Sequence, residues 1–268
     1  MKLHDKSILI TGAGSGIGRA TALALARKGA RLVLSGRRQG PLEETARLAQ
    51  AEGSKTLVLP GDVTDATWRD GVVNQIVEYF GGLDILINCA GVVSAGRLQD
   101  SEPDDVHTQI EVNLLAPILL IRSALPALRR SSDAAIVNVS SSIGLVGMPF
   151  YTSYAASKGG LAKFSEALRR ELSDDHVQVM TVYPGATDTP MMETAKSDAG
   201  DESGYETPEA VAKALVAGLE AGDLDVIRGG EDFAALVQTN QQDPRKADRQ
   251  IEQKKAGLES RAAKHRSM

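Results

Sequence analysis

The chain has 268 residues, of which 42% are hydrophobic and 24% charged, and its formal net charge is −5. This composition is typical of a globular protein, and a single α/β domain of this length is ordinary. The acidic balance argues against nucleic acid as a partner, because a nucleic-acid-binding face needs clustered lysine and arginine. The one cysteine, Cys89, excludes an internal disulfide framework and fits a reducing, cytoplasmic location.

From the sequence we expect no targeting segment, no membrane helix and no metal site. The first residues pass from a charged segment directly into a short strand-like run, without the pattern of a secretory or transit leader. We expect no apolar stretch to reach the roughly 18 residues that a membrane helix needs. The histidines are not spaced as metal ligands, so surface or capping positions are expected for all four: His4, His107, His176 and His265.

A glycine-rich turn follows the first predicted strand. Residues 6–11 (KSILIT) form an apolar run, residues 12–18 read GAGSGIG, and residues 19–30 have the alanine-rich composition of a helix. A strand, a glycine turn and a helix in this order are the setting in which a dinucleotide pyrophosphate binds a helix N-terminus. The spacing is Thr-Gly-x-x-x-Gly-Ile-Gly rather than Gly-x-Gly-x-x-Gly. The alternative is a tight turn without a ligand.

The end of the second predicted strand, residues 30–36, indicates which dinucleotide binds. An NAD site usually places a carboxylate there to bond the ribose 2′-hydroxyl. This chain has Gly36, followed by Arg37 and Arg38. Glycine removes the charge that would repel a 2′-phosphate, and a guanidinium can bind that phosphate with two hydrogen bonds. The sequence therefore predicts NADP, with NAD as the alternative.

Strands and helices then alternate to the end of the domain. Asp62 and Val63 follow the third strand and are expected within reach of an adenine ring. Polar, acidic residues 191–207 are expected to form a mobile loop over a site. Seven strands with intervening helices predict a Rossmann-type, doubly wound parallel sheet in one domain, residues 1–242. The further predicted strands are 55–60, 83–91, 134–139, 177–190 and 224–229; the further helices are 41–52, 66–80, 103–130, 158–172 and 208–221.

The last segment, residues 243–268, differs from the rest of the chain. It is nearly free of apolar residues and is net basic. Such a segment buries little apolar surface, so we expect a flexible tail that is either a solvated helix or disordered.

Three residues near the middle of the chain suggest acid–base chemistry. Tyr154 and Lys158 are four positions apart on a predicted helix, so their side chains leave one face of it, and Ser141 ends the neighbouring strand. An ammonium beside a phenol favours the phenolate and lowers the tyrosine pKa from about 10. The Ser141 hydroxyl can then hold a substrate oxygen while the tyrosine transfers the proton. Tyr151 is the nearby alternative, but it has no lysine four residues further on.

Taken together, these segments resemble the short-chain dehydrogenase/reductase family, classical type. The resemblance covers residues 6–230. It is carried by TGAGSGIG (residues 11–18), NCAG (88–91), Asn113, Ser141, YAASK (154–158) and PGATDT (184–189). NCAG has a cysteine where many members have a second asparagine, and Ser15 stands where many NADP-using relatives have a basic residue.

The resemblance implies a catalytic tetrad of Asn113, Ser141, Tyr154 and Lys158. Tyr154 would exchange a proton with the substrate oxygen during hydride transfer, Lys158 would bind the nicotinamide ribose, Asn113 would hold a water in a proton relay, and Ser141 would orient the substrate. Members of the family are usually dimers or tetramers, which implies a homo-oligomer. The implied cofactor contacts are Gly12, Ser15, Ile17, Gly18, Arg37, Arg38, Asp62, Val63, Asn88, Ala90, Gly91, Tyr154, Lys158, Pro184, Gly185, Thr187 and Thr189.

Three functions therefore follow from the sequence. The first is an NADP-dependent oxidoreductase that acts on a ketone or secondary alcohol, with an NAD-dependent enzyme of the same family as its variant. The second is a nucleotide-binding regulator without catalysis, and the third is a sugar-nucleotide epimerase or dehydratase. For the first, an apolar small-molecule substrate is expected from the residues predicted to line its pocket, which are Val93, Ile143, Leu145, Met148, Phe150, Met191 and Met192.

Overall fold

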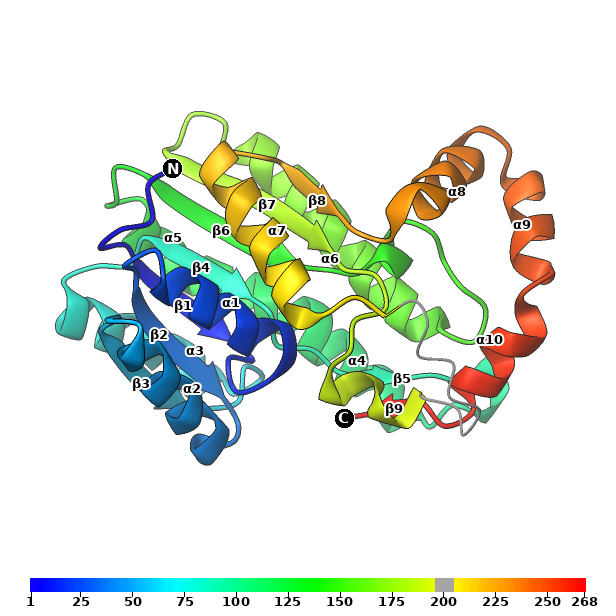
Figure 1. Ribbon diagram of the computed structural model, residues 1–268, viewed down its shortest axis with the longest axis horizontal. Coiled ribbons are helices and arrows are strands. Elements are labelled where there is room, and N and C mark those ends of the chain that lie inside the picture. The colour runs from blue at the N-terminus through cyan, green and yellow to red at the C-terminus, as the bar shows by residue number, and fades with distance from the viewer. Residues whose placement is uncertain (196–204) are drawn as a thin grey trace.

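The sheet has seven parallel strands in the order β3-β2-β1-β4-β6-β7-β8 (Figure 1). This computed structural model describes residues 1–195 and 205–268, so part of the predicted loop 191–207 lies outside the described residues. The strand order reverses between β1 and β4, and ligands of such sheets bind at that point, beyond the carboxyl ends of the strands. The strands are Ser7–Thr11 (β1), Arg31–Gly36 (β2), Thr56–Pro60 (β3), Ile85–Asn88 (β4), Ala134–Val139 (β6), Val177–Tyr183 (β7) and Asp225–Ile227 (β8).

Helices cover both faces of this sheet, so its central strands are apolar on both sides. In β1, Ile8 and Ile10 pack into one core and Leu9 packs into the other. The first core is completed by α1 (Gly16–Ala26), α2 (Gln39–Ala51) and α7 (Pro208–Ala221). The second is completed by α3 (Ala66–Phe80), α5 (Ala116–Leu128) and α6 (Thr152–Glu171). The prediction of a doubly wound parallel sheet is confirmed.

The predicted helix 103–130 contains one wide turn. It consists of α4 (Pro103–Ile110), a π-helix (Glu111–Leu115) and α5, and Pro126 lies inside α5. Contrary to expectation, the segment Pro103–Leu128 is long and apolar enough to cross a membrane by length and composition alone. Its buried residues, among them Leu120 and Ile121, contribute to the core on the α3 side of the sheet. Length and composition therefore do not distinguish it from a core helix.

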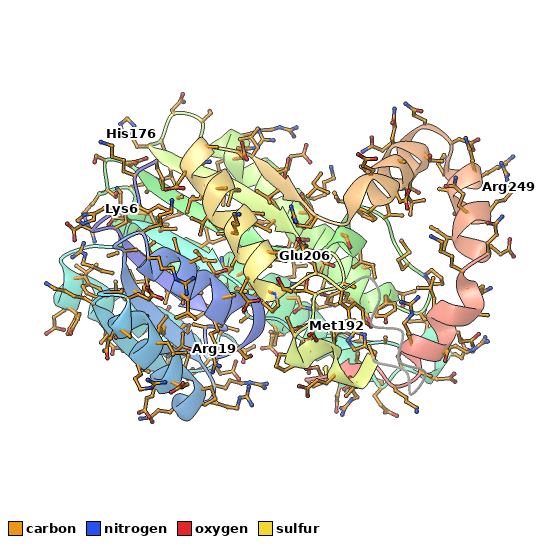
Figure 2. All side chains as sticks on the ribbon, viewed as in Figure 1. Lys6, Arg19, His176, Met192, Glu206 and Arg249 are labelled. Carbon is orange, nitrogen blue, oxygen red and sulfur yellow. The ribbon has the colours of Figure 1, made fainter. Side chains whose placement is uncertain are left out.

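After β8 the chain leaves the sheet, and its last residues return to the edge of the sheet where the parallel strands have their carboxyl ends (Figure 1). Helices α8 (Gly230–Gln242) and α9 (Pro244–Glu252) project from the body, and Arg249 points outward from α9 in Figure 2. Helix α10 (Lys255–Ala262) leads back to β9 (Arg266–Ser267), which pairs antiparallel with β5 (Val93–Ser94). The segment predicted as a tail is thus helical here, and its last residues pack against the domain.

Candidate active site

A cavity of about 360 Å³ opens beyond the carboxyl ends of the parallel strands. A second cavity of about 210 Å³ adjoins it, and Gly12, Ser15 and Gly91 line both. Most of the residues that the sequence predicts for cofactor and catalysis lie on these walls. The larger cavity is lined by Gly12, Ser15, Ile17, Gly18, Ala90, Gly91, Ser141, Tyr154, Lys158, Pro184, Gly185, Thr187 and Thr189; the smaller is lined by Arg37, Arg38, Asp62 and Val63.

The glycine turn fits tightly against the loop after β4. Gly12 has a φ of +70°, and a Cβ added there would lie 2.9 Å from the Ala90 Cα atom. A Cβ on Gly18 would lie 2.3 Å from the Gly12 carbonyl oxygen. The Thr11 hydroxyl accepts hydrogen bonds from the backbone N–H groups of Cys89 (3.0 Å) and Ala90 (3.1 Å). The turn needs glycine because side chains would collide with backbone, and it leaves an open concave surface at the start of α1.

The beginning of α1 is suited to an anion. Ser15 is the N-cap residue of α1, and its side chain makes no capping hydrogen bond. The first backbone N–H groups of a helix lack intrahelical partners and carry partial positive charge. The segment 184–189 crosses nearby, since a Cβ on Gly16 would lie 3.0 Å from the Thr189 Cγ2 atom. The helix start and that segment both line the larger cavity, so a pyrophosphate bound at this helix end would lie next to both.

The smaller cavity is lined by charged residues that follow β2 and β3. Gly36 ends β2, and Arg37 and Arg38 line the cavity beside it. Asp62 lines the same cavity, and its Oδ1 atom accepts hydrogen bonds from the Thr64 backbone N–H (2.9 Å) and hydroxyl (2.8 Å). The carboxylate on this wall is thus held by its own loop. Of the two guanidinium groups at the strand end, that of Arg37 also donates to the Met268 carbonyl oxygen at 3.2 Å.

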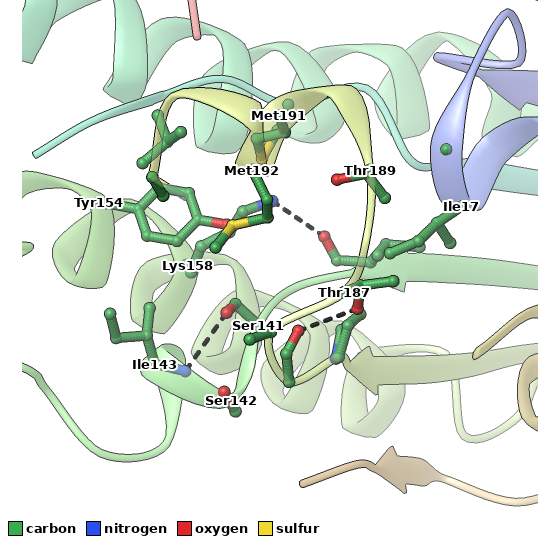
Figure 3. A pocket seen from close by; sticks show the side chains of 18 of the residues that line it. Ile17, Ser141, Ser142, Ile143, Tyr154, Lys158, Thr187, Thr189, Met191 and Met192 are labelled. Carbon is green, nitrogen blue, oxygen red and sulfur yellow. Dashed lines mark hydrogen bonds between the residues drawn. The ribbon is translucent and has the colours of Figure 1, made fainter. Parts of the chain in front are cut away.

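Ser141, Tyr154 and Lys158 border one space in the larger cavity (Figure 3). Ser141 follows β6 and caps a short 3-10 helix, where its Oγ accepts a hydrogen bond from the Ile143 N–H at 3.4 Å. Tyr154 and Lys158 lie one turn apart on α6, and the Lys158 Nζ is 5.8 Å from the centroid of the Tyr154 ring. Lys158 also donates to the Val139 carbonyl at 3.1 Å and is only 4% exposed. These contacts fix the lysine at the floor of the cavity.

Burial changes both ionisable groups in directions that the sequence did not fully anticipate. Desolvation raises the pKa of Tyr154 to about 12, although a hydrogen bond with Ser141 acts in the opposite direction. Desolvation also lowers the pKa of Lys158 to about 8. The predicted lowering of the tyrosine pKa by Lys158 is therefore not found in the protein alone, because burial of the phenol outweighs the favourable contacts. Tyr154 stays protonated near neutral pH, which is the state that can donate a proton.

Asn113 holds the π-helix against two neighbouring elements rather than lining either cavity. Its Oδ1 accepts from the Val92 N–H and its Nδ2 donates to the Val92 carbonyl, both at 2.9 Å, and Nδ2 also donates to the Ser157 hydroxyl at 3.1 Å. The side chain is fully buried. It therefore ties the loop after β4 to α6, and its implied part in a proton relay stays a prediction.

Asn88 likewise lies away from the cavity walls. It is 3% exposed, and its Nδ2 donates to the Asn138 Oδ1 at 2.9 Å; Asn138 in turn donates to the Ser165 hydroxyl at 2.8 Å. This chain of hydrogen bonds links β4, β6 and α6 beneath the site. Its visible function is to connect the strands that carry the catalytic candidates, and a direct cofactor contact stays a prediction.

The sequence missed an entire wall of the larger cavity. Tyr151 and Tyr205 line it together with Leu258, Arg261 and His265 from the C-terminal segment. The expected surface or capping position for His265 is wrong, because this residue is 4% exposed. No pattern in a basic, apolar-poor segment indicated this return to the domain. Of the residues predicted to line an apolar substrate pocket, Val93, Ile143, Met148, Met191 and Met192 do so, and Leu145 and Phe150 are not among the lining residues.

Comparisons with known proteins show the family to which the chain is similar. The family profile described as short chain dehydrogenase matches residues 6–200. Among curated proteins, the ketoacyl reductase HetN of Nostoc sp. is 33% identical over 226 residues, covering 84% of this chain and 79% of that protein. An uncharacterized oxidoreductase of Thermotoga maritima is 35% identical over 187 residues, covering 70% of this chain and 74% of its own.

Two solved structures share the fold over most of their length. An alcohol dehydrogenase from the archaeon Thermococcus sibiricus, complexed with 5-hydroxy-NADP, has a TM-score of 0.77 and 28% identity and covers 84% of this chain and 96% of its own. A short chain dehydrogenase/reductase from Burkholderia phymatum, in complex with NAD, has a TM-score of 0.84 and 25% identity and covers 91% of this chain and 96% of its own.

The chain therefore belongs to the short-chain dehydrogenase/reductase family. It is an oxidoreductase that uses a nicotinamide cofactor, and it acts on a small-molecule substrate.

Proposed function

We propose that this protein is an NADP-dependent oxidoreductase that interconverts a ketone and a secondary alcohol, with Tyr154 as the acid and base. The observation that carries the proposal is the single cavity that the glycine turn shares with Ser141, Tyr154 and Lys158. The cavity offers a proton donor, a cation and a hydroxyl at the mouth of a dinucleotide cradle, which are the groups that reduction of a carbonyl needs.

The cofactor would lie along both cavities. The start of α1 and the glycine turn would hold the pyrophosphate, and Arg37 and Arg38 would hold a 2′-phosphate at the end of β2. The bound nicotinamide supplies or accepts the hydride. The chain itself has to bind this group, orient the substrate beside it and handle one proton.

Tyr154 and Ser141 would handle the proton and the substrate oxygen. The raised pKa of Tyr154, about 12, keeps the phenol protonated, so its hydroxyl can donate to a carbonyl oxygen as the alcohol forms. Ser141 would hold the same oxygen, since both side chains border one space. Lys158 would bind the nicotinamide ribose, and its ammonium would favour the phenolate that remains when Tyr154 has given up its proton.

The test is a fluorescence titration of the purified protein with NADPH and, separately, NADH. We expect tighter binding of NADPH, and Arg37→Ala should weaken NADPH binding about tenfold or more while NADH binding changes little, because only NADPH carries the 2′-phosphate. Arg129→Ala, which removes an arginine that pairs with Asp175, is the matched control. Preference for NADH would overturn the NADP assignment, and binding of neither cofactor would favour the regulator.

Two broader predictions belong to the same proposal. A homo-oligomer is supported by half-exposed apolar side chains such as Leu115 on the α4–α5 segment, which is 46% exposed, and analytical ultracentrifugation tests it. A cytoplasmic location is supported by the single free cysteine, Cys89, whose pKa burial raises to about 11 so that it is an unreactive thiol.

A further inference from the structure

His265 is a buried titratable residue that the proposed reaction does not use. It lies on the wall of the larger cavity, and its two ring nitrogens each have a partner: Nδ1 is 3.0 Å from the Tyr151 hydroxyl, and Nε2 is 3.0 Å from the Met191 carbonyl oxygen. The rings of His265 and Tyr151 meet edge to face, with centroids 5.7 Å apart. The pair thus joins the C-terminal segment to the residue that precedes α6.

These partners determine which nitrogen carries the proton. A carbonyl oxygen can only accept, so the Nε2 atom that faces Met191 must be the N–H donor. In a neutral imidazole the other nitrogen is then an acceptor, and the Tyr151 hydroxyl must donate to Nδ1. Burial lowers the pKa of His265 from its usual value near 6.5, which favours the neutral ring at neutral pH.

The contact with His265 fixes how the Tyr151 hydroxyl is oriented in the larger cavity. Because the Tyr151 hydrogen points to His265, the oxygen of Tyr151 presents only lone pairs elsewhere, and no other group in residues 1–195 and 205–268 forms a hydrogen bond with it. Tyr151 lines the same cavity as Ser141 and Tyr154. The cavity therefore contains a fixed hydrogen-bond acceptor, beside the residues proposed to handle the substrate oxygen.

We propose that Tyr151 and His265 form a substrate-selecting pair that favours ketones with a hydrogen-bond donor, such as a hydroxyl group, on the first or second carbon from the carbonyl. A second keto oxygen in that position would face the Tyr151 oxygen, acceptor against acceptor, and would leave a desolvated polar group unpaired. This inference rests on the proposed ketone reduction. It makes His265 a positioning residue, which acts through Tyr151.

The pair is not needed merely to hold the segment in place, because other contacts do so. Arg266 forms two hydrogen bonds with the Asp105 carboxylate, at 2.8 and 2.9 Å. The Thr194 hydroxyl bonds both the N–H and the carbonyl of Arg266, and the His265 carbonyl accepts from the Ala95 N–H at 3.0 Å. The position of the His265 backbone is thus set independently of its ring.

The experiment compares matched ketones. Each pair has a hydroxyl or a keto group on the same carbon: 3-hydroxy-2-butanone with 2,3-butanedione, and 4-hydroxy-2-pentanone with 2,4-pentanedione. The measured quantity is the ratio of kcat/KM for the hydroxyketone to kcat/KM for the diketone, in wild type and variant. Comparing these ratios between proteins cancels the different intrinsic reactivities of the ketones.

We expect His265→Leu and Tyr151→Phe each to lower this ratio about tenfold for at least one pair, the size of one well-placed hydrogen bond. In His265→Leu the Tyr151 hydroxyl has no acceptor and can turn its hydrogen into the cavity, whereas Tyr151→Phe removes the oxygen. His265→Gln should keep the ratio within about threefold, because its amide can accept from Tyr151 and donate to Met191.

Two outcomes separate the possible failures. If the ketones are reduced but both ratios stay unchanged in His265→Leu and Tyr151→Phe, the substrate-selecting pair is wrong and the oxidoreductase proposal stands. If wild type reduces none of the four ketones with either cofactor, the proposed function and the selection fail together. Nitrogen NMR of the imidazole tests the tautomer independently of activity, and a protonated Nδ1 in the neutral ring would overturn the inference.

Discussion

Two walls of the site are built by different means. The cofactor wall comes from β1, β4 and the start of α1, where strands pair residue by residue and glycine turns touch backbone. The opposite wall comes from Tyr151, Tyr205 and the C-terminal segment, which are held by one short strand pairing and by side-chain contacts such as that between Arg266 and Asp105. Changes to the first wall should therefore damage folding and all activity, whereas changes to the second should alter which substrate is used.

The two walls differ in how easily their atoms can move when a residue is replaced. At Gly18 the nearest atom to an added Cβ is a backbone oxygen, which cannot move without displacing the turn. On the opposite wall the contacts involve the ends of side chains, which can take other rotamers. A wall made of backbone atoms suits a cofactor of fixed shape. A wall made of side-chain ends allows substrate preference to change without loss of the fold.

The largest effect is expected from Gly18→Ala. Its Cβ would lie 2.3 Å from the Gly12 carbonyl oxygen, so we expect a loss of about 1–3 kcal/mol of unfolding free energy and loss of NADPH binding. Gly40→Ala is the matched control, because it also lies in a helix and a Cβ there meets nothing within 4 Å. It should be neutral or stabilise the protein by up to about 1 kcal/mol. Urea unfolding measures both, and equal behaviour of the two would contradict the tight turn.

A smaller but still large effect is expected from Tyr154→Phe. If Tyr154 supplies the proton, kcat should fall about a hundredfold or more while the Kd for NADPH stays nearly unchanged. Tyr151→Phe is the control, because Tyr151 lines the same cavity and should affect substrate preference rather than the chemical step. Steady-state kinetics and the fluorescence titration separate the two results. Wild-type turnover in Tyr154→Phe would show that another group handles the proton.

The pH dependence of cofactor binding should follow Lys158. Its pKa is lowered to about 8, so the ammonium is present below that pH and is lost as the pH rises through it. We therefore expect NADPH affinity to fall above about pH 8 in wild type. Lys158→Arg keeps a cation at higher pH, so the fall should move beyond the measured range. Titrations between about pH 6 and 9.5 test this, and a curve of the same shape in both proteins would exclude Lys158 as its cause.

The cofactor wall is also the part that the sequence predicts well, for the same physical reason. Its turn lies within residues 11–18, and Tyr154 and Lys158 are separated by one helical turn, so short-range geometry brings these groups together. The central strands are rich in apolar residues and buried along their length because both of their faces are covered. Local sequence therefore determines both the sheet and most of the predicted site.

The opposite wall depends on contacts between residues far apart in the chain. Tyr151 and His265 are 114 residues apart, and no periodicity in a charged segment predicts their contact. Asn113 could be recognised as a polar residue in an apolar stripe, but not that its amide would bond Val92. The direction of the Tyr154 pKa shift was missed for a related reason, because desolvation depends on every element packed around the phenol.

The smallest effect is expected from Arg266→Ala, which tests whether the second wall depends on one ion pair. The Asp105 side chain is 10% exposed and that of Arg266 is 64% exposed, so solvent screens the pair from one side. The Arg266 backbone contacts with Thr194 should persist. We therefore expect KM for the ketone to rise about two- to fivefold, with less effect at high salt and little change in kcat.

Two comparisons make this last result interpretable. Arg129→Ala breaks the pair with Asp175, whose side chain is 31% exposed, and should leave KM unchanged because this pair lies outside both cavity walls. Combining Arg266→Ala with Asp105→Asn should add little to the KM of either single variant if the two groups act through each other. An unchanged KM in Arg266→Ala would mean that the β5–β9 pairing and the Thr194 contacts hold the wall by themselves. Substrate preference would then depend on the Tyr151–His265 contact and not on how firmly the segment is anchored.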